Sequence, residues 1–279
     1  MGDCAMGVRS VTQQTARAAL GKAAALVGWL PLAALVPLSV LAGDLPATVR
    51  YLPLVASVVV FGMPHGAVDY VALPRARMGR VALRGVAEVS VLYLVAGGAY
   101  LALWFYWPMG AAMGFIALTW YHWGQGDLYA LRALFETDHV DDLSQQALAV
   151  VVRGGLPMLV PLLGFPDTYQ RVVATFVEPF GATPNEWWLF DPRARLAMAG
   201  IFGTITIIAL ARGFVRARDR RGWRLDAAET TLLWVYFLLV PPILAIGVYF
   251  CLWHSVRHIA RVILLDDRSI EDIAAWQWH

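Results

Sequence analysis

Charged side chains are scarce in this chain, and their scarcity excludes most soluble folds. Asp, Glu, Lys and Arg together make up 15% of the 279 residues, whereas hydrophobic residues make up 59%. A soluble domain usually carries about 25% charged and about 45–50% apolar residues. Both departures are typical of a chain that crosses a membrane several times.

Cysteine is also scarce, and no large excess of one charge sign is present. The two cysteines, Cys4 and Cys251, fall in a polar leader and in an apolar run, so a disulfide framework is not expected. The net charge is only +2, and the basic residues are dispersed among short loops. A nucleic-acid partner is therefore not expected, because such binding needs a patch of positive charge.

Long apolar runs fill the chain instead, and they predict an all-α, polytopic membrane bundle. A membrane helix needs about 20 mostly apolar residues. Seven segments meet this requirement: 22–42, 50–73, 86–106, 109–132, 146–165, 194–214 and 230–263. We expect one transmembrane domain over 1–279, with a polar leader at 1–21. The proline-rich, acidic stretch 166–193 is expected to connect two helices outside the membrane or at its interface.

Arginine clusters predict the orientation of the chain. They lie in the leader, between residues 75 and 84, and between residues 212 and 224. Because cytoplasmic loops are enriched in Lys and Arg, we expect a multi-pass protein of the cell (inner/plasma) membrane with a cytoplasmic N-terminus. The first apolar run exceeds the roughly 7–15 residues of a signal peptide, so we interpret it as a retained helix.

The last apolar segment, 230–263, is too long for a single span. It would form a helix on the order of 50 Å long, against about 30 Å of hydrocarbon. Pro241-Pro242 interrupts it, and a kink or break is expected there because proline removes a backbone donor and clashes with the preceding turn. If seven segments each cross once, a straight last helix carries His254 away from the depth of the earlier histidines and ends on the outer side.

Four histidines lie inside apolar segments: His65, His122, His254 and His258. Ionisable side chains at lipid depth are costly and point to a function or a buried partner. His254 and His258 are four residues apart, so they stand on one helix face and both can reach one ion. Imidazole ligands suit Zn, Cu, Fe and Ni rather than Ca or Mg. The sequence therefore predicts that the four histidines converge on one metal ion, although a lone buried histidine more often hydrogen-bonds a neighbouring helix than binds a metal.

Two aspartates are candidates to orient the histidines. Asp69 follows His65 by one helical turn, and Asp127 follows His122 in the next motif. Each carboxylate is placed to accept a ring proton from a ligand histidine, and the alternative is a charged helix end facing water. Arg257 either reaches toward lipid phosphates or pairs with one of these aspartates. His139, in an acidic loop, is expected to be solvated.

Aromatic residues flank the histidines. They are candidates to line a slot for a long apolar substrate, and the alternative for each is packing in the core. The five residues are Trp120, Tyr121, Trp123, Tyr249 and Trp253.

Taken in order, Pro64-His65-Gly66 with Asp69, His122 with Asp127, and His254-x-x-x-His258 resemble the Brp/Blh family of membrane β-carotene 15,15′-dioxygenases of bacteria and archaea. The resemblance covers roughly residues 55–265. It implies an Fe2+ enzyme that takes β-carotene from the lipid phase and cleaves its central double bond with O2. The two retinal products would serve an opsin.

The same resemblance implies that the four histidines ligate the iron and that the two aspartates orient them. Other functional classes remain open. A desaturase-like di-iron enzyme or other lipid oxygenase would use more histidines than the six present. A b-haem electron carrier would use two of the four. A retinal-binding receptor is disfavoured because the only lysine, Lys22, lies at the edge of the first run, and a zinc protease because residues 254–258 contain no glutamate.

Overall fold

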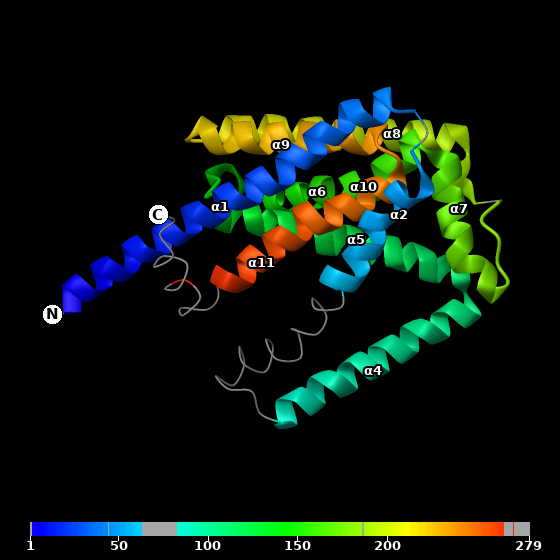
Figure 1. The fold of residues 1–279 in the computed structure, drawn as a ribbon, viewed down its shortest axis with the longest axis horizontal. Coiled ribbons are helices and arrows are strands. Elements are labelled where there is room, and N and C mark those ends of the chain that lie inside the picture. The colour runs from blue at the N-terminus through cyan, green and yellow to red at the C-terminus, as the bar shows by residue number, and fades with distance from the viewer. Residues whose placement is uncertain (1, 44, 63–82, 186, 265–269, 271–279) are drawn as a thin grey trace.

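The computed structural model describes residues 2–43, 45–62, 83–185, 187–264 and 270. Within these ranges every regular element is a helix, as the sequence predicts. The six long helices are α1 (Gly2–Leu41), α4 (Leu83–Tyr106), α5 (Pro108–Tyr129), α6 (Leu143–Gly164), α8 (Pro192–Arg216) and α9 (Arg220–Leu239). Figure 1 shows most of them side by side, with α4 apart from the others.

Shorter elements complete the bundle. The α-helical ones are α2 (Ala47–Ala56), α7 (Pro166–Val177), α10 (Pro242–Val248) and α11 (Ser255–Leu264). The π-helical ones are η1 (Ser57–Gly62), η2 (Ala130–Leu134) and η6 (Tyr249–His254). The 3-10 turns are η3 (Asp138–Val140), η4 (Glu178–Phe180) and η5 (Trp188–Phe190).

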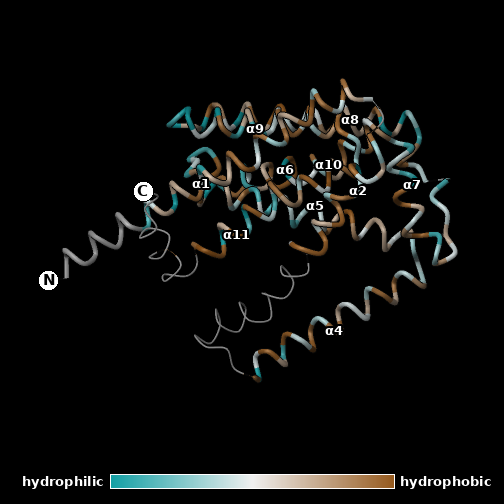
Figure 2. The backbone as a smooth tube through the Cα atoms, in the orientation of Figure 1, coloured by the Kyte–Doolittle hydropathy of each residue, from teal (hydrophilic) through white to brown (hydrophobic). Residues whose placement is uncertain are grey.

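Five helical segments of the described ranges are long and apolar enough to cross a membrane. They are Gln13–Leu41, Leu83–Tyr106, Leu143–Gly164, Pro192–Arg216 and Pro242–Leu264. Figure 2 shows hydrophobic residues spread along α4, whose apolar side chains are largely exposed. These features support a membrane helical bundle, but the expected count of seven spans is not confirmed.

Glycines allow α5 and α6 to pack closely at the centre of the bundle. A Cβ atom at Gly124 would lie 2.2 Å from the carbonyl oxygen of Val150, and one at Gly154 would lie 1.8 Å from that of Trp120. No larger residue fits either position without moving a backbone. Gly124 meets Val150, whereas Trp120, one turn earlier in α5, meets Gly154, one turn later in α6. The two helices therefore run antiparallel.

The long last segment is two helices, as the prolines predict. α9 ends at Leu239, and α10, η6 and α11 form one continuous helical run that starts at Pro242. The prediction was wrong about where α9 begins. The arginine-rich stretch 212–224 is largely helical rather than a loop, since α8 extends to Arg216 and α9 starts at Arg220.

Because α9 is a separate helix, the last helical run, Pro242–Leu264, points in the opposite direction to the one predicted. Trp123 packs against Tyr249, Asp127 contacts Arg257, and Arg261 lies over the ring of Tyr129. The last helix therefore runs parallel to α5, which brings His254 to the depth of His122. Its end also packs against α1 near the start of the apolar segment Gln13–Leu41, where Leu20 and Leu264 share a hydrophobic cluster. The last helix thus ends beside the start of the first apolar segment rather than opposite it, and the side of the membrane on which either lies stays a prediction.

The connection 166–193 contains α7, η4 and η5, and no helix in its described part is long and apolar enough to span a membrane. Figure 1 shows α7 across one end of the bundle. Its inner face packs with α5, where Val173 and Val177 join a cluster with Ala112. Its position at the membrane interface stays a prediction.

Candidate metal centre

Three of the four predicted histidines meet at one small cavity. The cavity has a volume of about 50 Å³, and His122, His254 and His258 all line it. The other lining residues are Gln125, Gly126, Arg257 and Arg261. The ring centroids of His122 and His254 lie 5.2 Å apart, with the ring planes at 61°. Segments separated by more than a hundred residues in the sequence thus place imidazoles beside one another.

Local helix geometry accounts for the position of His254. The residue closes η6, and the wider π-helical turns precede α11, which carries His258. Short π-helical segments inside α-helices are frequent at functional sites. His254 is only 3% exposed, whereas His258 is half-buried and His122 is exposed. The prediction that both histidines of the pair face one point is consistent with this cavity.

Packing fixes the His254 ring from several sides. The rings of Phe250 and Trp123 lie 5.6 and 5.8 Å from it, centroid to centroid. On the α5 side, a Cβ atom added at Gly126 would lie 3.2 Å from His254 Cε1. Glycine at this position lets the α5 backbone approach the imidazole closely.

The donor set fits a metal ion that prefers nitrogen ligands. Imidazoles that share one ion through metal–nitrogen bonds of about 2.1 Å hold their ring centroids roughly 5 Å apart. The 5.2 Å separation of His122 and His254 matches this spacing. Within the described ranges, no group of three or more His, Cys, Asp or Glu side chains is already close enough to hold a metal ion. His65 and Asp69 lie outside the described residues, so the four-histidine set stays a prediction.

Asp127 is buried and paired, which excludes a charged helix end facing water. Its carboxylate accepts hydrogen bonds from Trp253 Nε1 at 3.0 Å and from Arg257 Nη1 at 3.1 Å. The predicted alternative that Arg257 pairs with an aspartate is therefore confirmed, and Arg257 is itself only 2% exposed. An additional role for Asp127 in orienting a ligand histidine stays a prediction.

A buried ionic network that the sequence reasoning missed surrounds this pair. Arg153 Nη2 lies 2.6 Å from Glu229 Oε2 and 2.9 Å from Asp226 Oδ1. The available signal was an arginine inside an apolar segment, since such residues face partners in a bundle interior. The predicted segment 146–165 contains Arg153, whereas the predicted last segment starts at residue 230, after both acids.

His139 belongs to the same network, and the prediction that it is solvated was wrong. Its side chain is 1% exposed, and its Nε2 lies 2.9 Å from Asp226 Oδ2. The 3-10 turn η3, which carries His139, packs against α6, α8 and α9. Asp138, one of the acidic neighbours that suggested a surface loop, instead accepts from the backbone N–H groups of Arg218 and Asp219 in the turn between α8 and α9.

Most of the aromatic slot candidates are core residues in the described structure. Trp123, Tyr249 and Trp253 are all below 7% exposed and pack within the central cluster. Trp120 donates its Nε1–H to the carbonyl of Val151, and Tyr121 is exposed at 54%. Burial favours the packing alternative for the first three, and the substrate slot stays a prediction.

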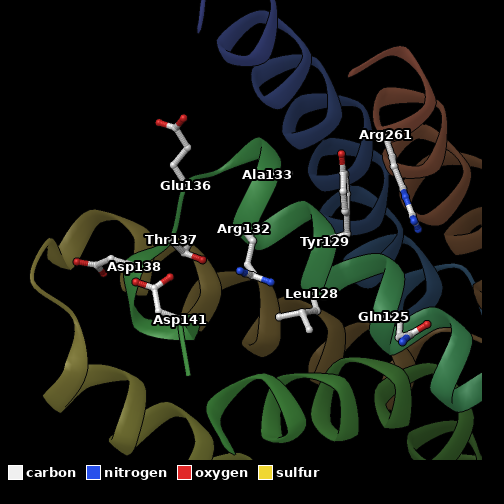
Figure 3. A pocket seen from close by; sticks show the side chains of 10 residues that line it. All are labelled: Gln125, Leu128, Tyr129, Arg132, Ala133, Glu136, Thr137, Asp138, Asp141 and Arg261. Carbon is white, nitrogen blue, oxygen red and sulfur yellow. The ribbon is translucent and has the colours of Figure 1, made fainter. Parts of the chain in front are cut away.

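A larger, polar cavity adjoins the histidines. Its volume is about 670 Å³, and it shares Gln125 and Arg261 with the smaller cavity. Figure 3 shows the side chains that line it, which come from α5, η2, the following turn and α11. They include both basic and acidic groups, among them Arg132, Glu136 and Asp141. The histidine cavity is thus flanked by the apolar core on one side and by polar side chains on the other.

Comparison with known proteins gives consistent results. A family model described as "Beta-carotene 15,15'-dioxygenase" matches residues 56–277. The chain is 52% identical over 259 residues to "Probable beta-carotene 15,15'-dioxygenase Blh" of Halobacterium salinarum strain NRC-1, which covers 92% of this chain and 75% of that protein. It is 31% identical over 264 residues to "Probable beta-carotene 15,15'-dioxygenase Brp" of strain R1, covering 82% and 70%. No solved structure matches significantly.

Proposed function

The chain belongs to the β-carotene 15,15′-dioxygenase family, and from this premise we propose that it cleaves the central double bond of β-carotene with O2 to give two retinal molecules. It is a carotenoid-cleaving dioxygenase built on membrane helices. The observation that carries the proposal is the meeting of His122, His254 and His258 at one cavity within the family match.

We further propose Fe2+ as the metal. The residues that would hold it are His122, His254 and His258 from the described cavity, together with His65. When bound, iron would supply the electron transfer that lets O2 react with a closed-shell polyene, which redox-inert zinc cannot do. Neutral imidazoles suit this site, since they carry no charge into an apolar bundle.

The chain's own residues would position and protect the reacting groups. Phe250 and Trp123 hold the His254 imidazole in a fixed orientation and exclude water from one side of it. A substrate dissolved in lipid would enter laterally between helices, because a C40 polyene is poorly soluble in water. We expect the retinal to leave into the same lipid phase, where an opsin could take it up, and we expect the N-terminus to be cytoplasmic.

The b-haem alternative finds no support in the described cavity. Two imidazoles on opposite faces of one haem iron would hold their ring centroids roughly 6 Å apart, whereas those of His122 and His254 lie 5.2 Å apart. A Soret band in the purified protein would contradict this conclusion.

Expression in a β-carotene-producing bacterial host tests the proposed reaction. We expect loss of the orange colour and extractable retinal with the wild-type chain, and neither with His122→Ala. Thr204→Ala is a matched control, because Thr204 is exposed on α8 and donates only to the carbonyl of Gly200 in its own helix. Bleaching without retinal would place cleavage elsewhere on the polyene. Unchanged colour with folded, iron-containing protein would overturn the proposal.

A further inference from the structure

Four buried charged side chains close a ring beside the histidine cavity. Arg153 Nη2 lies 2.6 Å from Glu229 Oε2, and Arg257 Nη2 hydrogen-bonds the other oxygen of Glu229. Arg257 Nη1 lies 3.1 Å from Asp127 Oδ1, and Arg153 Nη1 completes the circuit 3.5 Å from Asp127 Oδ2. Each of the four residues is at most 2% exposed. We call this alternating arrangement the charge ring.

The charge ring joins the helices that carry the histidines. Asp127 lies on α5 with His122, whereas Arg257 lies on α11 between His254 and His258. Arg153 and Glu229 come from α6 and α9 and connect the two. Trp29 of α1 also donates to Glu229, at 2.9 Å. Because an ion pair of this kind has strict geometry, it fixes the spacing and register of α5 against the last helix.

Arg257 belongs to the charge ring and also lines the histidine cavity. It lines the histidine cavity, and its guanidinium carbon lies 3.9 Å from the Trp253 ring centroid. The indole N–H of Trp253 in turn donates to both carboxylate oxygens of Asp127, at 3.0 and 3.2 Å. A cation held next to a metal site would repel a dication strongly in a low-dielectric interior. The carboxylates of Asp127 and Glu229 pair with Arg257, and Asp226 pairs with Arg153, so no excess positive charge is left beside the cavity.

We propose that the charge ring is the positioning and charge-compensating frame of the metal centre. It sets the approach of His122 toward His254 and His258, and it neutralises Arg257 so that uncharged imidazoles can bind a dication beside it. The proposal rests on the proposed function, because it assumes that these histidines hold a metal. It assigns a role to Arg153 and Glu229, neither of which lines the histidine cavity.

The proposal predicts that metal affinity follows the sign of the charge that is removed. Glu229→Gln removes a negative charge that contacts Arg257 directly, so the affinity for Co2+ should fall at least tenfold. Arg153→Gln leaves an excess negative charge and keeps both contacts of Arg257, so the affinity should be unchanged or higher. The double variant Arg153→Gln/Glu229→Gln removes one charge of each sign and should recover most of the loss.

Titration of the metal-free full-length protein in detergent with Co2+ alone, followed by the visible d–d absorption, measures these affinities. Glu88→Gln is the matched control, because Glu88 is exposed on α4 and pairs with Arg84 one turn away in the same helix. Glu229→Asp keeps the charge on a shorter side chain and should bind Co2+ nearly as the wild type does. Circular dichroism and size-exclusion profiles establish that each variant is folded, and if Glu229→Gln misfolds, Asp127→Asn takes its place with the same expected loss.

The outcomes separate this proposal from the proposed function. If Glu229→Gln and Arg153→Gln lose similar Co2+ affinity, and the double variant binds still more weakly, the proposed role of the charge ring would be wrong. The proposed metal centre would not be affected by that result. A wild-type protein that binds no Co2+ would overturn both. Opposite responses of the two single variants, with recovery in the double variant, would support the frame, because general loss of packing does not depend on charge sign.

Discussion

At the scale of the residue, the spacing of histidines predicts which of them meet, whereas the neighbouring residues in the sequence do not predict which histidine is buried. The separation of four residues predicts that His254 and His258 share a face, and both line the cavity. Arg257 was correctly considered as a partner of Asp127. The burial of His139 could not be predicted, since it depends on α8 and α9 closing over a turn that is polar in sequence.

Gly126 of α5 faces the His254 ring at close range. In Gly126→Ala the new methyl would lie 3.2 Å from His254 Cε1, closer than ordinary contact, so the imidazole must shift. Small displacements of catalytic groups are costly, and we expect roughly a tenfold loss of retinal formation with the fold retained. The measurement is retinal yield per folded protein.

Gly97→Ala provides the control for this substitution. Gly97 lies in α4, where a Cβ atom meets nothing within 4 Å, so activity should be unchanged. Equal activity of Gly126→Ala and wild type would show that the position of the His254 ring is unimportant.

At the scale of the element, the charged composition of residues 220–229 does not predict the first half of α9. Asp226 and Glu229 give its first half a polar composition, so the predicted apolar segment starts only at residue 230. The acids are in fact buried against Arg153 and Arg257, which removes the cost of placing them inside a bundle. The break at Pro241-Pro242 was predictable because it follows from proline alone.

The contact between α5 and α6 gives a stability prediction. In Gly154→Ala the added Cβ would lie 1.8 Å from the carbonyl oxygen of Trp120, so the helices must separate. Overpacking of this kind usually costs about 1–3 kcal/mol. We expect a lower thermal unfolding temperature in detergent for this variant.

Gly203→Ala tests the same chemical change without the steric conflict. Gly203 lies in α8, and a Cβ atom there meets nothing within 4 Å. Its unfolding temperature should equal or exceed that of the wild type, since alanine favours helix. A wild-type unfolding temperature for Gly154→Ala would contradict the close packing described here.

At the scale of the whole molecule, the membrane class of the fold was predictable and its topology was not. Long apolar runs predict helices, and the described ranges contain five that can cross a membrane. α9 turns the chain once more before His254 and so sets the direction of the last helix. A prediction that joins α9 and the last helix into one segment gives the wrong direction. Charges pair across α5, α6, α9 and α11, and the composition of a single segment cannot reveal such pairing.

The central claim is that the histidines hold one metal ion, and the metal content of the purified full-length protein tests it most directly. Elemental analysis should give one iron per chain in the wild type. His122→Ala, His254→Ala and His258→Ala should each retain much less iron while keeping helical content. Two irons per chain, or full iron retention in all three variants, would contradict the account.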